Sequence, residues 1–199
     1  CTGQVLAASG TCNVGVRFSP ASAGAKSATL EVEGTPGGIA PASLTGTGLA
    51  PAQLSISPPS FAFPNTVVGG TSASQSFTVS NTGGVSAGTT VARAAVLGIP
   101  NAADFLINTN TCTGTLGAGL TCSVVVSFKP TGSGARSSSL NVTATPGGSA
   151  PAALSGTGET PAALTLSVGA TSSVNFGGIA VGASATMTYV VGNSGQQTT

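Results

Sequence analysis

Cys112-Thr-Gly-Thr-Leu-Gly-Ala-Gly-Leu-Thr-Cys122 begins a segment that occurs twice in the chain, and Leu154-Ser-Gly-Thr-Gly158 ends it. Nearly the same text runs from Cys1 to Gly48. Corresponding residues of the two copies are 110 positions apart, as in 122 minus 12. The matching pairs are Cys122 and Cys12, Pro130 and Pro20, Pro146 and Pro36, and Gly158 and Gly48. Because self-similarity at a fixed period is the signature of repeat architectures, the chain is predicted to be a tandem array.

The period divides the chain into three segments. Residues 1–48 match the back half of a repeat, residues 49–158 form a complete repeat, and residues 159–199 match the front of a third. The third segment matches the central one at offsets of 110 to 113, and the matched residues include Pro161 and Pro51, Phe176 and Phe63, and Asn193 and Asn81. A unit of this length has an ordinary single-domain size and can bury its own core.

Composition favours short strands and argues against several kinds of partner. The 199 residues are 40% hydrophobic and 4% aromatic, with 30 Gly and 12 Pro to interrupt regular structure. A net charge of +1 is too small to attract nucleic acid or anionic lipid, so neither is an expected partner. Pro and Gly interrupt every apolar run well before 18 residues, so no membrane span is expected.

Alternation of apolar and polar residues locates the strands. Strands are predicted at Cys12–Phe18, at Gln75–Asn81 and at Cys122–Phe128, where Val124, Val126 and Phe128 share one face. Thr90–Leu97 is more uniformly apolar, so a helix is the alternative there, although its β-branched residues favour a strand. Seven or eight short strands separated by turn residues predict an all-β fold of tandem immunoglobulin-like antiparallel β-sandwiches.

Turns and linkers are predicted from Pro and Gly. Pro36-Gly37-Gly38 and Pro146-Gly147-Gly148 are expected to reverse the chain within a hairpin. The Gly-Thr-Gly sequences at Gly46–Gly48 and Gly156–Gly158 are expected to be short linkers between domains.

The central unit resembles a known family of repeats. The motifs that carry the resemblance are Phe63 to Gly69, Phe77-Thr-Val-Ser-Asn-Thr-Gly83, Asp104-Phe105, Cys112, Cys122-Ser-Val-Val-Val-Ser-Phe-Lys-Pro130, Gly134 and Leu154-Ser-Gly-Thr-Gly158. They are similar to the bacterial choice-of-anchor D repeats, relatives of the ASPM-SPD-2-Hydin and major-sperm-protein-like immunoglobulin folds. Pro64 departs from the Gly usual after the Phe, whereas Gly177 keeps it. The resemblance implies an immunoglobulin-like sandwich in a large secreted or surface-anchored protein, and it supplies no catalytic residues.

The four cysteines are predicted to form two disulfides, Cys1 with Cys12 and Cys112 with Cys122, because each pair brackets a Gly-containing loop inside one repeat. The loop between Cys112 and Cys122 is expected to be flexible. Free buried thiols are the alternative, and lipidation of Cys1 is another. Neither a CxxC spacing nor any His is present, which argues against a redox or metal site. Disulfides imply an oxidising compartment, so an extracellular or cell-surface location is expected.

Few side chains suit catalysis, since the chain has four acids, five bases and no His. Glu31 and Glu33 share a strand face and are interpreted as solvated, while Lys26 and Arg136 are interpreted as cations that end a loop. Asn141 begins the only clean N-glycosylation sequon. The glycines do not form a phosphate-binding loop, so no cofactor, metal or catalytic residue is predicted.

A non-enzymatic structural module of an extracellular or cell-surface protein is the function that these features favour, with a fibre as one expected form. The alternative is an adhesin-type module that binds glycans or proteins through loops at the ends of the sandwich, and an enzyme ranks third. The expected partners are copies of itself or adjoining repeats, joined head to tail. Residues 1–48 and 159–199 of two neighbours would supply all of a sandwich except the stretch equivalent to Gly88–Asn110. Continuation of the polypeptide into further repeats is the other way to complete each half.

Overall fold

The computed structural model of the chain describes residues 1, 3, 5–94, 101–168 and 173–198. Its regular secondary structure in this part consists of fourteen strands and one short 3-10 helix, which confirms the predicted all-β class. The chain separates into two compact units, Cys1–Pro51 and Ala52–Thr199. None of the described residues belongs to a helix long and apolar enough to cross a membrane.

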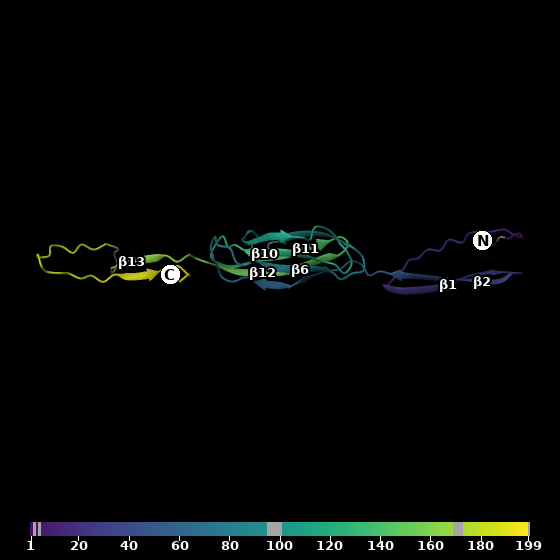
Figure 1. Ribbon diagram of the computed structural model, residues 1–199, viewed down its shortest axis with the longest axis horizontal. Coiled ribbons are helices and arrows are strands. Elements are labelled where there is room, and N and C mark those ends of the chain that lie inside the picture. Colours follow the sequence, from purple (N-terminus) through teal and green to yellow (C-terminus); the bar gives the residue numbers. More distant parts are fainter. Residues whose placement is uncertain (2, 4, 95–100, 169–172, 199) are drawn as a thin grey trace. The chain divides into compact units, whose positions relative to one another are not determined.

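Two sheets face each other within the second unit (Figure 1). The first sheet has the order β3-β6-β10-β8, with strands β3 (Leu54–Ser57), β6 (Gln75–Asn81), β10 (Thr121–Phe128) and β8 (Phe105–Asn110). The second has the order β4-β12-β11-β7-β9, with strands β4 (Ser60–Ala62), β12 (Gly148–Glu159), β11 (Gly134–Ala144), β7 (Ala87–Ala94) and β9 (Gly114–Leu116). A short strand, β5 (Thr66–Val67), also pairs with β12, and both β4 and β5 run parallel to it. All other pairings are antiparallel, which gives an immunoglobulin-like β-sandwich.

Alternation along the strands builds the core between the sheets. Val124, Val126 and Phe128 of β10 are fully buried, which confirms the predicted inward row. They meet apolar side chains from β11 and β12 on the opposite sheet, among them Leu140, Val142 and Leu154. Four Phe rings, Phe61, Phe63, Phe105 and Phe128, form a cluster with centroids 4.8 to 6.2 Å apart. Burial of such side chains is the main stabilising contribution to a sandwich of this size.

The two hairpins share one register. Strands β1 (Gly24–Gly34) and β2 (Gly38–Gly48) of the first unit pair from Gly24 with Gly48 to Gly34 with Gly38. In the second unit, β11 and β12 pair from Gly134 with Gly158 to Ala144 with Gly148, so each landmark lies 110 residues further on. Both turns contain paired glycines with positive φ, at 151° and 77° in the first and 141° and 77° in the second. An L side chain rarely adopts these conformations, so the local sequence determines where each hairpin reverses.

Three expectations about loops are wrong. The Gly-Thr-Gly sequences are not linkers, because they belong to strands β2 and β12 and lie at or near the ends of these strands. The stretch between Cys112 and Cys122 is not simply a flexible loop, because β9 lies in it and pairs with β7, which buries Leu116. Lys26 and Arg136 lie within β1 and β11 instead of loops.

The predicted strand at Cys12–Phe18 does not form in the structure. Its counterpart β10 is hydrogen-bonded on both sides, to β6 and β8, whereas no strand of the described residues pairs with Cys12–Phe18. In the last segment β13 (Leu164–Ser167) pairs with β14 (Val190–Asn193). For Thr90–Leu97, the strand is found through Ala94 and the helix is excluded there, while residues 95–97 lie outside the described part.

Candidate functional site

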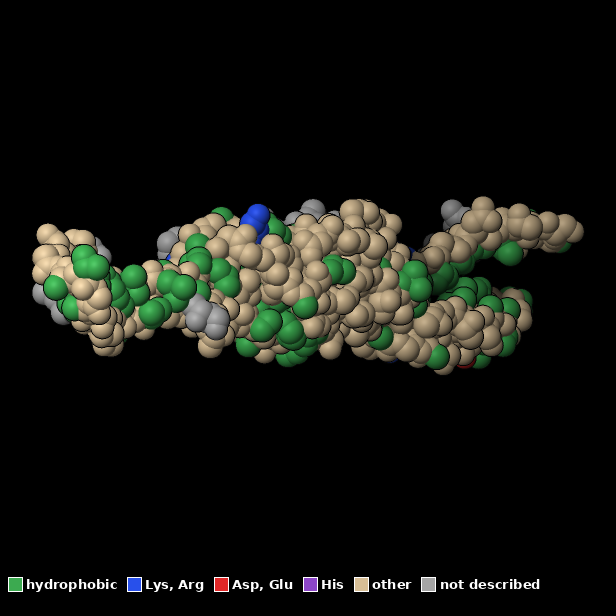
Figure 2. All heavy atoms as spheres, turned by 60° about the vertical axis from the view of Figure 1, so that its left-hand side comes forward, with side chains coloured by type: hydrophobic (Ala, Val, Ile, Leu, Met, Phe, Trp, Pro, Cys, Tyr) green, Lys and Arg blue, Asp and Glu red, His purple; other side chains and the backbone are tan. Residues whose placement is uncertain are grey.

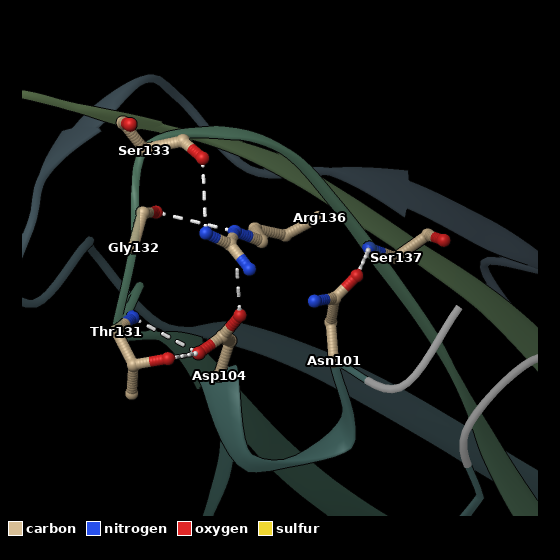
Figure 3. Close-up of polar contacts among 7 residues, drawn as sticks. All are labelled: Asn101, Asp104, Thr131, Gly132, Ser133, Arg136 and Ser137. Carbon is tan, nitrogen blue, oxygen red and sulfur yellow. Dashed lines mark hydrogen bonds and ion pairs between the residues drawn. The ribbon is translucent and has the colours of Figure 1, made fainter.

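A group of residues joined by polar contacts surrounds Asp104 in the second unit (Figure 3). We call it the Asp104 cluster, and it consists of Asn101, Asp104, Thr131, Gly132, Ser133, Arg136 and Ser137. Asp104 ends the 3-10 helix η1 (Ala102–Asp104), directly before β8. Asp104 is only 1% exposed, so its carboxylate must find partners within the protein.

Asp104 ties helix η1 to the loop that follows β10. Its Oδ1 accepts hydrogen bonds from the Thr131 backbone N–H at 2.9 Å and from the Thr131 hydroxyl at 2.7 Å. Its own carbonyl oxygen accepts from the Lys129 N–H at 2.7 Å. Hydrogen bonds to a carboxylate are stronger than those between neutral groups, so this one residue fixes two loops together.

Arg136 closes the same loop from the other side. Its Nε and Nη2 donate to the carbonyl oxygens of Gly132 and Ser133 at 3.1 and 2.9 Å, and Nε lies 3.7 Å from Asp104 Oδ2. Asp104 Oδ2 has no hydrogen-bond partner among the described residues, so its stabilisation is the charge of the guanidinium. The cluster is therefore structural: the Asp104 carboxylate and the Arg136 guanidinium bind backbone groups of the loop after β10, and their opposite charges attract each other.

A hollow of about 400 Å³ lies beside Arg136, between β4, β11 and β12. Most of the described residues that line it have small side chains, and Arg136 is the one charged residue among them. Asn65 at its rim donates from Nδ2 to Glu159 Oε1 at 2.7 Å. General acid-base catalysis needs a titratable group that reaches the substrate, and the neighbouring Asp104 is buried behind the arginine instead of lining the hollow.

The structure joins all four cysteines in two disulfides, Cys1–Cys12 and Cys112–Cys122, with Cα atoms 5.5 and 5.1 Å apart. Cys112 is buried in the core, and its N–H donates to Asn110 Oδ1 at 2.8 Å. In the described ranges, no three His, Cys, Asp or Glu side chains gather as metal ligands would.

The other residues singled out from the sequence are not brought together. Glu31 and Glu33 are exposed on β1. Lys26 Nζ donates to Ser22 Oγ at 2.8 Å, so it spans the loop at the position that Arg136 occupies in the second unit. Asn141 is half-buried on β11, where its Oδ1 accepts from the Ser139 hydroxyl at 3.1 Å.

Sequence reasoning missed a buried asparagine, Asn81, at the end of β6. Its Oδ1 accepts from the N–H groups of Gln53 and Gly83, at 3.1 and 3.0 Å. Its Nδ2 donates to the carbonyl oxygens of Val85 and Leu116, at 2.7 and 3.1 Å. The sequence signal for Asn81 was an Asn-Thr-Gly at the end of the predicted strand Gln75–Asn81, and the signal for Asp104 was an acid directly before an apolar stretch.

No protein-family model matches the chain, and no curated protein matches it. Among solved structures it is similar to the ASH/PapD-like domain of human CEP192 (PapD-like domain 7), with a TM-score of 0.43 and 18% identity over 55% of this chain and 87% of that one. It is also similar to two Vibrio cholerae proteins, the secreted serine protease VesC (TM-score 0.39, 22% identity, 58% of this chain) and the VesB protease (0.39, 23%, 53%). The matched region spans 24% of the VesC chain and 32% of the VesB chain. The likeness is one of fold, and no activity of these proteins extends from it to this chain.

Proposed function

We propose that this chain is a structural, non-enzymatic module of an extracellular or cell-surface protein, an array of disulfide-braced immunoglobulin-like domains that associate head to tail into a fibre. The observation that carries the proposal is the shared register of the two hairpins, in which β11 and β12 repeat the pairing of β1 and β2 at an offset of 110. Repeats of one supersecondary unit are suited to setting length and spacing, since each contacts mainly its neighbours.

Mechanical resistance is the property that such a module needs. Residues 52–158 combine a closed apolar core with β12, a strand that is hydrogen-bonded along its length to β11 and in part to β4 and β5. The disulfide between Cys112 and Cys122 prevents the residues between them from extending when the domain is unfolded by force. Both features favour a unit that stays folded under load and yields little chain when it opens.

The disulfides also support the proposed location. Structural disulfides persist in oxidising compartments and are uncommon where thiols are kept reduced. The resemblance of the central repeat to choice-of-anchor D domains agrees with a secreted or surface-anchored bacterial protein. Sparse surface charge, visible in Figure 2, favours contact between copies because it offers little repulsion.

Single-molecule stretching of the 199-residue chain tests the structural role. We expect one main force peak, from the sandwich of the second unit, and an increase in its released length of about 30 Å after reduction, because the disulfide bridges a sequence separation of 10 residues whose Cα atoms are 5.1 Å apart. Graded extension without a peak, or a released length that reductant does not change, would contradict a disulfide-braced mechanical module.

An adhesin-type module is the competing function, and the hollow beside Arg136 is where it would be tested. A glycan and peptide binding screen with the same chain, compared with Arg136→Gln, distinguishes the two. Binding that the substitution abolishes would favour the adhesin, whereas the structural role predicts no saturable binding of either class.

A further inference from the structure

An apolar surface in the first unit is exposed, although the corresponding residues of the second unit are buried. We call it the N-terminal face, and it is formed by Val14, Val16 and Phe18. Phe18 is 53% exposed, whereas its counterpart at offset 110, Phe128, is 0% exposed. Val14 and Val16 are likewise exposed, and their counterparts Val124 and Val126 are fully buried.

The N-terminal face repeats one contact of the closed sandwich, that between a Phe ring and a Gly of the hairpin. A Cβ on Gly46 would lie 2.8 Å from the Phe18 ring, as a Cβ on Gly156 would lie 2.7 Å from the Phe128 ring. The extended stretch before Phe18 and the β1–β2 hairpin enclose a hollow of about 380 Å³, and hydrophobic side chains line the gap between them in Figure 2. In the second unit the ring of Phe63 occupies the matching position, 6.2 Å from the Phe128 ring. The first unit therefore holds a prepared position for an aromatic side chain.

The last segment of the chain carries the complementary side chains. We call Phe176, Tyr189 and Val191 the C-terminal face. Their counterparts are Phe63, Phe77 and Val79, at offsets of 113, 112 and 112, and all three counterparts are buried. Val191 is 64% exposed where Val79 is 0% exposed.

The pairing of β6 with β10 shows how these two faces fit. In the second unit Val124 pairs with Phe77 and Cys122 pairs with Val79 in antiparallel register. Transferring the offsets pairs Val14 with Tyr189 and Cys12 with Val191. In that register apolar side chains from both strands point to the same side, and both stretches gain hydrogen-bond partners that they lack in the structure of the single chain.

Asn193 supports the same register. Its Oδ1 accepts from the N–H groups of Ala163 and Gly195 at 3.0 and 2.9 Å, which repeats the local contacts of Asn81. The Nδ2 of Asn193 donates to the Gln197 carbonyl oxygen, as that of Asn81 donates to the Val85 carbonyl oxygen. Asn81 Nδ2 donates in addition to the carbonyl oxygens of Leu116 and Gly117, at 3.1 and 3.3 Å. The counterpart of Leu116 at offset 110 is Leu6, which is exposed on the first unit.

We propose that the N-terminal face of one copy binds the C-terminal face of a second copy, as β10 binds β6 within the closed sandwich. This inference rests on the proposed head-to-tail function and names the surfaces that would carry it. A second copy is the occupant because every chain presents both faces, and each face matches the other through a register that the second unit already displays. The contact is heterologous, since it joins two different surfaces, and it propagates into a filament unless the geometry closes a ring.

Two substitutions, one on each face, test the proposal. Val14→Asp places a carboxylate on the N-terminal face and Val191→Asp places one on the C-terminal face, and both side chains are exposed in the single chain. Sedimentation velocity over a wide concentration range should show that the wild type forms assemblies of increasing numbers of copies as its concentration rises. Each variant alone should associate at least about a hundredfold more weakly, since an unpaired carboxylate is disfavoured in an apolar contact. An equimolar mixture of the two variants keeps one intact pair of faces and should form 1:1 dimers that do not grow.

The matched control is Val190→Asp, which alters the neighbouring residue. Val190 is as exposed as Val191, but its counterpart Thr78 faces outward in the closed sandwich, so this variant should assemble as the wild type does. A wild type that remains monomeric at every concentration would overturn the proposal and assign both faces to adjoining repeats of one polypeptide. Mixtures that grow beyond dimers, or equal loss of assembly in Val190→Asp, would overturn it too. None of these three results would alter the force peak of the second unit, so failure here is distinguishable from failure of the structural role.

Discussion

The ring of Phe128 lies over Gly156, so close that a Cβ at Gly156 would come within 2.7 Å of a ring carbon. Phe128 ends β10 in one sheet and Gly156 lies near the end of β12 in the other, so this contact sets the separation of the two sheets. Phe18 and Gly46 repeat the contact in the first unit. Because Gly156 has no side chain, the ring of Phe128 on the opposite sheet can pack directly against its backbone.

Gly156→Ala should therefore destabilise the sandwich. An added methyl group meets the Phe128 ring and must displace it, which costs about 1 to 3 kcal/mol as overpacking. Thermal unfolding followed by circular dichroism measures the loss. Gly88→Ala is the control, because a Cβ there would lie 3.5 Å from the nearest atom, an ordinary contact, and the melting temperature should stay close to that of the wild type.

Phe128→Ala should reduce stability more than any exposed substitution. Loss of a fully buried Phe that packs against Phe63 and Phe105 costs about 3 to 5 kcal/mol. Urea unfolding gives the free energy directly, with Leu120→Ala as an apolar control on the surface. Arg136→Ala should fall between the two. Equal midpoints for Phe128→Ala and Arg136→Ala would show that the inward face of β10 is wrongly assigned.

Asp104→Asn should loosen the two loops that Asp104 joins. The substitution keeps the shape of the side chain but removes its charge, so both Thr131 contacts and the attraction to Arg136 weaken, at a cost of about 2 to 3 kcal/mol. Combining it with Thr131→Val in a double-mutant cycle should give strongly non-additive losses. Glu33→Gln, on an exposed strand face, should change the free energy of unfolding by less than about 0.5 kcal/mol. Additive effects in the cycle would argue against a direct clamp.

Replacing Cys112 and Cys122 together by Ala should cost about 2 to 3 kcal/mol, the loop-closure contribution expected for a separation of 10 residues. Reductant should lower the melting temperature of the wild type toward that of the double variant. Peptide mapping under non-reducing conditions checks the connectivity, and a bond between Cys12 and Cys112 would contradict it.

Local alternation predicted several strands well, because a strand such as Gln75–Asn81 has its face determined by its own residues. Features that depend on distant partners were not predictable in this way. Leu116 is a strand residue because β7 lies beside it and pairs with β9. The alternation of Cys12–Phe18 predicts which side chains share a face, but a strand also needs a neighbouring strand to pair with, and the structure shows none there among the described residues. The burial of Asp104 likewise depends on a loop 27 residues later in the chain, which no local pattern reports.

Amide hydrogen exchange of the full chain, measured at low and high concentration, distinguishes the closed sandwich from the two open apolar faces. We expect amides of β6, β10 and β11 to exchange slowly and together at both concentrations, as one closed sandwich. We expect amides of residues 12–18 and 187–193 to exchange rapidly in dilute solution and to become protected as concentration rises. Protection of residues 12–18 in dilute monomer, or rapid exchange of β10, would contradict an array of one closed sandwich and two open faces.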